Sequence, residues 1–333
     1  MVRVGIPRAL LYFKFFPLWK KFLDELGCEV VLSPKTNQKI LEKGVEIGFN
    51  ELCLPIKLYY GHMAKLLDKY PDLDYVFIPR YIALDTKGFY CPKFLSLPDA
   101  MKANFHDMPP VLEWEVNSKQ NLKAVWAIAF GRQLGMPTTR IMDAYSKAVH
   151  YYKEYHEVLR KGVPVPDALE SVEKGEPFPD PSEIEEKPLT IFVLGHPYNT
   201  FEEFTNMSMM EKIQEMGANV LALENLPERV FEHRVKVSDK FDNYWGNEQD
   251  ILQASNYFYN SGADEIDGVI FLISFACGPD SLIAEIVMRD MKDRGVPYMS
   301  LILDEHSGNA GLMTRIETFV EMIKRKKLME VTH

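Results

Sequence analysis

The sequence predicts an α/β fold in which two parallel-sheet domains are joined by a helical connector. Short β-branched runs alternate with amphipathic segments near the N-terminus, a Pro- and Glu-rich stretch follows a long helix in the middle, and the alternation then begins again. The chain has 333 residues, 47% of them hydrophobic, which is enough for two cores. We expect an N-terminal domain at 1–130, a connector at 131–187 and a C-terminal domain at 188–333.

The first domain begins with strand and helix signals at the spacing of βα units. Apolar, β-branched runs predict strands at Val2–Ile6, at Cys28–Leu32 and at residues 75–78, the last closed by Pro79. Apolar positions that recur on one face predict helices over residues 9–26, 36–43 and 56–69, and Gly27 is expected to end the first of them. A three-stranded parallel sheet covered by helices is therefore expected.

The middle of the chain loses the two-residue period, so no further strand is predicted there. Residues from about 135 to 162 have the pattern of one long, polar-faced helix. Residues 162–187 are rich in Pro and Glu, which is typical of a linker or a surface loop.

The second domain restarts the pattern. The predicted strands cover residues 189–194, 219–223, Gly268–Ser274 and Tyr298–Leu303, and the predicted helices cover residues 205–216 and 281–294. Strands that alternate with helices again indicate a parallel sheet. We therefore expect two α/β domains of similar design to face each other.

Composition excludes several classes of protein. A net charge of −10, from 38 Lys and Arg against 48 Asp and Glu, argues against non-specific binding of nucleic acid. No apolar run is long enough to span a membrane, and the first residues resemble a strand rather than a secretory signal peptide. We expect a soluble, cytoplasmic protein. Four cysteines are too few for a disulfide framework in a chain of this length.

Three of these cysteines lie where ligands bind in open α/β sheets, beyond the carboxyl ends of strands or in nearby loops. Cys277 follows the strand Gly268–Ser274 and precedes a helix, whose positive end is expected to lower the pKa of the thiol and favour metal ligation. Cys53 precedes a helix, and Cys91 lies in a loop after a strand. Cys28 begins a strand, so we interpret it as a core residue.

The spacing of the cysteines limits the kind of metal site. No Cys-x-x-Cys pair occurs, which excludes a zinc ribbon or a ferredoxin pattern. Three thiolates from separate loops suit an iron–sulfur cubane with one iron not held by cysteine better than they suit zinc. The alternative is that all three are small buried hydrophobic residues.

Further polar residues follow predicted strands. Asp304-Glu305-His306 could supply proton donors near a cluster, with Glu305 and His306 as candidates. The alternative is a loop whose carboxylates cap the following turn and pair with Arg315. His196 could face the same crevice or simply lie in a turn at the proline that follows it. Lys57 could bind an anionic substrate or form a salt bridge.

Several spaced motifs run through both domains. They are Gly5-Ile6-Pro7-Arg8-Ala9-Leu10, Cys53-Leu54-Pro55, Tyr90-Cys91-Pro92, Leu194-Gly195-His196-Pro197-Tyr198-Asn199, Cys277-Gly278-Pro279-Asp280 and Asp304-Glu305-His306-Ser307-Gly308-Asn309-Ala310-Gly311, with Arg315-Ile316-Glu317 after the last. In this combination the chain resembles the 2-hydroxyacyl-CoA dehydratase-related superfamily, and within it the DUF2229 branch, labelled acyl-CoA dehydratase activase-related.

The resemblance implies an oxygen-sensitive [4Fe-4S] cluster bound by Cys53, Cys91 and Cys277 between two Rossmann-like domains, in an anaerobic system. It also implies a separate ATP-dependent activase that reduces the cluster. Some relatives carry a double-cubane [8Fe-9S] cluster, but that would require more thiolates than these three, so we expect a single cubane. We find no Gly-rich phosphate loop, so the chain is expected to accept ATP-driven electrons rather than hydrolyse ATP.

The function that the resemblance implies is low-potential reduction or dehydration of a small substrate. The dehydratases act as two subunits of similar fold, so a homologous subunit or a second copy of this chain is an expected partner. The alternative hypothesis is a non-catalytic carrier of electrons or clusters for a partner enzyme. A small ligand should perturb an open iron, whereas a closed carrier should not respond.

Overall fold

The computed structural model describes residues 1–83, 88–117, 123–184, 187–236 and 245–331. Two four-stranded parallel sheets form its frame, in the orders β2-β1-β3-β4 and β6-β5-β7-β8. The strands are β1 (Val2–Ile6), β2 (Cys28–Leu32), β3 (Tyr75–Ala83), β4 (Val111–Asn117), β5 (Leu189–Gly195), β6 (Ala218–Leu221), β7 (Gly268–Ser274) and β8 (Tyr298–Leu303). The predicted fold class, α/β with two Rossmann-like parallel-sheet domains, is confirmed.

Helices cover both sheets and connect their strands. They are α1 (Tyr12–Leu26), α2 (Gln38–Ile47), α3 (Leu54–Lys69), α4 (Pro92–Leu95), α5 (Leu97–Asn104), α6 (Lys123–Gln133), α7 (Thr138–Arg160), α8 (Val165–Lys174), α9 (Pro197–Thr200), α10 (Glu203–Asn206), α11 (Met209–Glu215), α12 (Gly246–Tyr257), α13 (Gly278–Asp293) and α14 (Asn309–Val331). Gly27 ends α1 in the left-handed region with φ of 84°, as predicted, because glycine adopts that conformation without a Cβ clash.

The first sheet contains one strand more than the three predicted. In β4, the buried Leu112, Trp114 and Val116 alternate with Glu113 and Glu115. The strand lies at the edge of the sheet, and only one of its two faces is apolar. The two-residue period is therefore present at β4, and the prediction that the middle of the chain lacks strands is wrong.

The strand β3 also continues past Pro79, where the sequence predicted its end. The pairing of β1 with β3 involves only Tyr75 and Val76, and beyond them β3 pairs with β4 alone. Pro79 lies on the part of β3 that pairs only with β4. Its missing N–H therefore removes no hydrogen bond to β1.

The Pro- and Glu-rich stretch contains a packed helix rather than only a linker. Helix α8 buries Val165, Ala168, Leu169 and Val172. It begins directly after Pro164, with a further proline in its first turn. Because proline is favoured in the first turn of a helix, it marks the start of α8 rather than an irregular loop. Residues 185–186 of the predicted linker lie outside the described residues.

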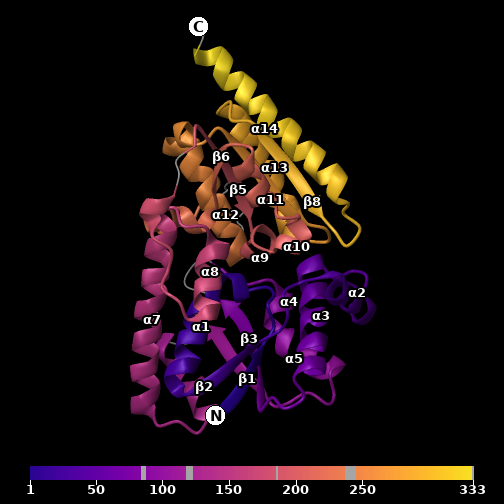
Figure 1. The fold of residues 1–333 in the computed structure, drawn as a ribbon, viewed down its shortest axis with the longest axis vertical. Coiled ribbons are helices and arrows are strands. Elements are labelled where there is room, and N and C mark those ends of the chain that lie inside the picture. The colour runs from indigo at the N-terminus through magenta and orange to yellow at the C-terminus, as the bar shows by residue number, and fades with distance from the viewer. Residues whose placement is uncertain (84–87, 118–122, 185–186, 237–244, 332–333) are drawn as a thin grey trace.

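The carboxyl ends of both sheets point toward the interface between them (Figure 1). Apolar residues of α2 and α3 share a core with the second sheet, where Leu41, Leu54 and Leu58 join Leu301 and Leu303. This shared core fixes the two carboxyl edges against each other. The domain boundaries expected at residues 130 and 187 stay predictions.

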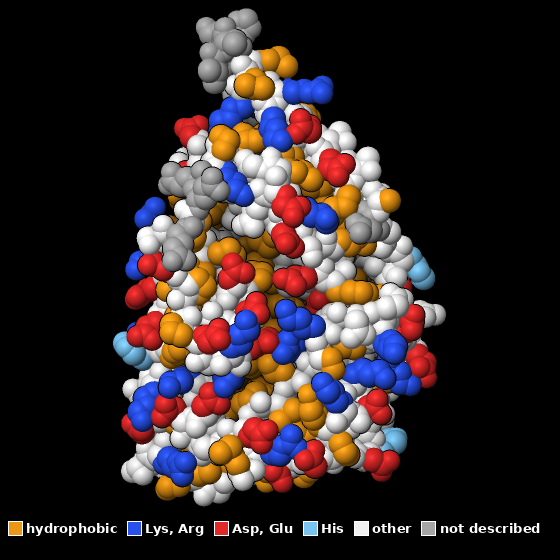
Figure 2. Space-filling model, in the orientation of Figure 1, with side chains coloured by type: hydrophobic (Ala, Val, Ile, Leu, Met, Phe, Trp, Pro, Cys, Tyr) orange, Lys and Arg blue, Asp and Glu red, His pale blue; other side chains and the backbone are white. Residues whose placement is uncertain are grey.

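On the face seen in Figure 2, basic and acidic side chains are interspersed rather than gathered by sign. No described helix is long and apolar enough to cross a bilayer.

Candidate functional site

Three of the four cysteines occupy the same local position, immediately before a helix. Cys53 precedes α3, Cys91 precedes α4 and Cys277 precedes α13, and each helix has a proline in its first turn. All three side chains are partly buried, whereas Cys28 is buried at the start of β2, as expected of a core residue. The three cysteines therefore differ from Cys28 in both burial and local structure.

Charge effects connect Cys53 with Cys91, and they connect Tyr198 with both Cys277 and Cys53. Burial raises the pKa of Cys91, and the charge of Cys53 raises it further. Burial also raises the pKa of Tyr198, which follows β5, and the charges of Cys277 and Cys53 add to that effect. Since charge effects of this kind fall with distance, Tyr198 lies near cysteines of both domains.

A compact group of ligand atoms surrounds Cys277. The group consists of His196, Glu248, Cys277 and Asp280, whose ligand atoms all lie within 4.8 Å of one another. The His196 Nε2 atom lies 2.8 Å from Oδ1 of Asp280 and 3.7 Å from Oε1 of Glu248. The structure thus brings His196 together with Cys277, and it adds two carboxylates that sequence reasoning did not propose as ligands.

The expected lowering of the pKa of Cys277 is not found. Burial raises the pKa of this thiol to about 11, and the neighbouring His196 only partly opposes the shift. Loss of solvation therefore outweighs the effect of the helix N-terminus on this thiol. A bound metal would have to displace the thiol proton, as metals do when they bind cysteine.

His196 and Asp280 form a buried ion pair. Burial alone would lower the pKa of His196, but the charge of Asp280 and the hydrogen bonds to Asp280, Cys277 and Glu248 together outweigh it and raise that pKa well above its usual value. Asp280 is 0% exposed, and neither of its carboxylate oxygens accepts an aligned hydrogen bond from the described residues. The carboxylate oxygens of Asp280 could therefore still act as ligands, although the residue is buried.

The other proposed acid–base residues lie apart from this group. Glu305 forms an ion pair with Lys57, whose Nζ lies 2.5 Å away, and His306 is exposed. Asp304 Oδ1 accepts hydrogen bonds from the His306 N–H and the Ser307 hydroxyl, which is the loop-capping arrangement.

Two further expectations concern the contacts of Arg315 and Lys57. Arg315 donates to the carbonyl oxygen of Ser300 rather than to the loop carboxylates, so that part of the alternative interpretation is wrong. Lys57 takes the salt-bridge role weighed for it.

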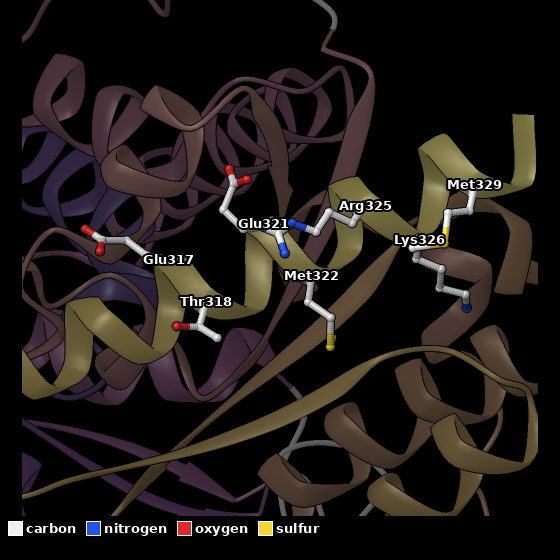
Figure 3. A pocket seen from close by; sticks show the side chains of 7 residues that line it. All are labelled: Glu317, Thr318, Glu321, Met322, Arg325, Lys326 and Met329. Atoms are coloured by element: carbon white, nitrogen blue, oxygen red, sulfur yellow. The ribbon is translucent and has the colours of Figure 1, made fainter. Parts of the chain in front are cut away.

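A surface hollow lies elsewhere, along one side of α14. It has a volume of about 1010 Å³ and is lined by seven residues of α14, whose side chains project from that one helix (Figure 3). Figure 1 shows the C-terminal end of α14 on the far side of the second sheet from the interface. We therefore do not place the functional site there.

Sequence reasoning missed Glu248 because α12 was not predicted. Helix α12 begins at Gly246, and its residues are only weakly amphipathic. The spacing of apolar residues in the sequence therefore did not predict a helix there. It also missed the strain beside Cys277, where Ala276 adopts φ of 65° in the left-handed region. Such conformations in residues other than glycine cluster at functional sites.

Two family models match the chain and confirm the family resemblance. Residues 3–226 match the family model described as CoA enzyme activase uncharacterised domain (DUF2229), and residues 185–323 match that described as 2-hydroxyglutaryl-CoA dehydratase, D-component. No curated protein matches the chain. The first match covers more than half of the chain and contains Cys53 and Cys91, and the second contains Cys277. The chain therefore belongs to the family of the CoA enzyme activase uncharacterised domain (DUF2229), and its C-terminal part is similar to the dehydratase D-component.

Proposed function

We propose that this protein is an iron–sulfur redox component that binds one [4Fe-4S] cluster through Cys53, Cys91 and Cys277. It receives electrons from a separate ATP-dependent activase and uses them for low-potential reduction or dehydration of a small substrate. The observation that carries the proposal is that the three cysteines share one local position before a helix; the proximity of Tyr198 to Cys277 and Cys53 supports it.

The donor set suits such a cluster. Cysteine thiolates are the usual protein ligands of iron–sulfur clusters. The three thiols come from three different helix starts, so the chain can present them from several directions rather than from one loop. The buried carboxylate of Asp280 pairs with His196, which lies beside Cys277 and would be oriented toward a bound cluster.

The chain's own residues would orient and shield the bound group. His196 stands beside Cys277 and is held by Asp280, so the ring is fixed where it can donate to a thiolate. Tyr198 packs against the ring of His196 with centroids 5.0 Å apart and against Phe94 of the first domain with centroids 5.9 Å apart, so it joins the two domains beside Cys277. When bound, the cluster would supply a low-potential one-electron donor.

The proposed partners follow from the two family matches. One matched family is described as a CoA enzyme activase domain and the other as a dehydratase component, which supports an activase and a second subunit as partners. That second subunit would be a homologous chain or another copy of this one. The substrate is a small molecule that fits between the domains.

The test is anaerobic purification or reconstitution followed by iron and sulfide analysis. We expect about four irons and four sulfides per chain, with an EPR signal after reduction. Cys53→Ser, Cys91→Ser and Cys277→Ser should each lose iron, whereas the matched variant Cys28→Ser should keep it. Near-zero iron after reconstitution of the wild-type protein would refute the proposal.

A second candidate function is binding of a single metal ion, favoured by the close group of His196, Glu248, Cys277 and Asp280. One thiolate, one imidazole and two carboxylates match the ligand preferences of Zn²⁺ or Fe²⁺. This candidate predicts one metal per chain without sulfide. It also predicts that Cys53→Ser and Cys91→Ser keep the metal, which separates it from the cluster.

A further inference from the structure

We propose that a cavity formed where the two domains and α8 meet binds an α-amino acid with an apolar side chain. The cavity has a volume of about 290 Å³, and its lining includes Arg8 and Thr36 of the first domain, Glu173 of α8, and Glu202 and Ser208 of the second domain. This volume is at the lower end for small-molecule sites, which favours a small ligand. The described residues that line it include none of the three cysteines proposed to hold the cluster, so the inference goes beyond the proposed function.

The cavity lies where open parallel sheets bind their ligands. Arg8 follows the last residue of β1 by two positions and Thr36 follows the last residue of β2 by four, and these strands are neighbours in the first sheet. Residues beyond the carboxyl ends of parallel strands line the crevice in which such sheets bind ligands. Phe201 and Glu202 line the same cavity from the segment after α9 in the second domain. A ligand bound there would contact both domains.

One chain of hydrogen bonds connects groups of the two domains at this cavity. The hydroxyl of Thr36 donates to Oε2 of Glu202 over 2.7 Å, and its oxygen lies 2.9 Å from Nε2 of His62. Nδ1 of His62 lies 2.8 Å from the hydroxyl of Ser33, whose oxygen accepts the main-chain N–H of Arg8 over 2.9 Å. His62 and Ser33 are both 0% exposed. The chain therefore fixes the polar groups before a ligand arrives, which lowers the entropic cost of binding.

The guanidinium group of Arg8 provides a partner for the carboxylate of an amino acid. Its Nη2 atom lies 2.7 Å from one carboxylate oxygen of Glu173, and the other oxygen accepts the hydroxyl of Tyr12. Nε of Arg8 is buried and has no hydrogen-bond partner within the described parts of the chain. A guanidinium carries five N–H donors in a planar fork that matches a carboxylate. Arg8 can therefore bind a second carboxylate beside that of Glu173.

Glu202 provides the opposite charge, for the ammonium group. It is 5% exposed and accepts hydrogen bonds from the Thr36 hydroxyl and the Phe204 N–H, but it forms no ion pair among the described residues. Burial raises the pKa of Glu202 to about 7 despite these hydrogen bonds. An ammonium group beside the carboxylate would favour its ionised form. The exposed Glu203 also lines the cavity and adds negative charge.

The remaining wall is mostly apolar, and one turn in it is strained. Phe13, Leu169 and Phe201 are buried and line the cavity. Met207 and Ser208, between α10 and α11, have φ of 60° and 53° in the left-handed region. Such conformations in residues other than glycine cluster at functional sites. A ligand with one carboxylate, one ammonium group and an apolar side chain matches these charges and this apolar surface.

The experiment titrates the full-length protein with three probes by isothermal titration calorimetry. They are L-leucine, 3-methylbutylamine, which lacks the carboxylate of leucine, and 4-methylpentanoate, which lacks its amine. The variants are Glu202→Gln and the double variant Arg8→Gln with Glu173→Gln, which leaves no unpaired Glu173 carboxylate. Glu176→Gln is the matched control, because Glu176 is an exposed glutamate just after α8 that does not line the cavity. Circular dichroism checks that each variant is folded.

We expect leucine to bind at one site per chain and each analogue to bind at least about tenfold more weakly, because each lacks one charged group. Glu202→Gln should weaken leucine binding about tenfold and leave that of 4-methylpentanoate unchanged. The double variant should weaken leucine binding and leave that of 3-methylbutylamine unchanged, and Glu176→Gln should bind leucine as the wild-type protein does.

Three results would each overturn the inference. They are absence of leucine binding to the wild-type protein, equal binding of the three probes, and leucine binding that Glu202→Gln does not change. If the double variant does not fold, Glu202→Gln still decides the outcome. Cys91→Ser should bind leucine as the wild-type protein does, so failure of the proposed cluster and failure of this site are distinguishable.

Discussion

Lys57 of α3 and Glu305 in the loop after β8 form an ion pair across the two domains, with Nζ 2.5 Å from Oε1. Lys57 is 3% exposed and the Glu305 side chain 18% exposed. Burial alone would raise the pKa of Glu305, but the hydrogen bond from Lys57 and its charge lower it. Because Lys57 lies one helical turn after Cys53, this pair also fixes the start of α3.

Removal of one partner should destabilise the protein more than removal of both. Glu305→Gln leaves the Lys57 ammonium buried without a counter-charge and should cost about 3 kcal/mol in the free energy of unfolding. The double variant Lys57→Met with Glu305→Leu should lose less than the sum of the single variants. Urea unfolding followed by circular dichroism measures this coupling, and strictly additive losses would contradict it.

A close helix crossing should make Gly61 intolerant of any side chain. A Cβ at Gly61 would lie 2.0 Å from the carbonyl oxygen of Ile40, which forces α2 away from α3. Gly61→Ala should therefore lower the free energy of unfolding by roughly 2 kcal/mol or more. Gly311→Ala is the control, since open space surrounds Gly311. Equal thermal midpoints for the two variants would count against the crossing.

The strained backbone before Cys277 offers a stabilising substitution. Ala276 has φ of 65°, where a Cβ costs about 1 kcal/mol and glycine pays no such penalty. Ala276→Gly should therefore raise the free energy of unfolding by up to that amount. The same change at Ala284, inside α13, should lower it by about 1 kcal/mol. A loss of stability in Ala276→Gly would show that the strain is absent.

Glu202 should make the protein less stable as the pH rises. Burial raises its pKa from 4.5 to about 7, despite hydrogen bonds from the Thr36 hydroxyl and the Phe204 N–H. Between these values the folded protein binds more protons than the unfolded chain, so the free energy of unfolding falls with pH, by up to roughly 3 kcal/mol in all.

Substitution of Glu202 tests this dependence. Glu202→Gln should remove most of the fall in stability between pH 5 and pH 8, which urea unfolding at several pH values would show. The exposed neighbour Glu203 provides the control variant, Glu203→Gln. An unchanged pH profile in Glu202→Gln would refute the assignment.

The sequence predicted the strands and helix ends whose signal lies in a few neighbouring residues. The strand Val2–Ile6 and the end of α1 at Gly27 follow from apolar runs and from the conformational freedom of glycine. The edge strand β4 was missed because Glu113 and Glu115 face away from the core. Helix α8 was missed because its prolines resemble a linker although they begin a helix.

The candidate site was also predicted only in part from the sequence. The positions of Cys53 and Cys277 before helices were apparent from the proline in or near each first turn, whereas Cys91 was expected in a loop and precedes the short helix α4. Glu248 was not apparent, because its place depends on contacts of α12 with Phe89 and Lys14 that are distant in sequence. The pKa of Cys277 was predicted in the wrong direction because burial at the interface outweighs the local effect of the helix.

The sequence by itself therefore determined the alternation of strands and helices in both domains, the positions of Cys53 and Cys277 before helices, and the family that the chain resembles. Only the tertiary structure decided that Cys277 lies in one group with His196, Glu248 and Asp280 and that Glu305 pairs with Lys57. The physical reason is that helix caps and strand periods depend on neighbouring residues, whereas desolvation and charge pairing depend on which distant segments are packed together.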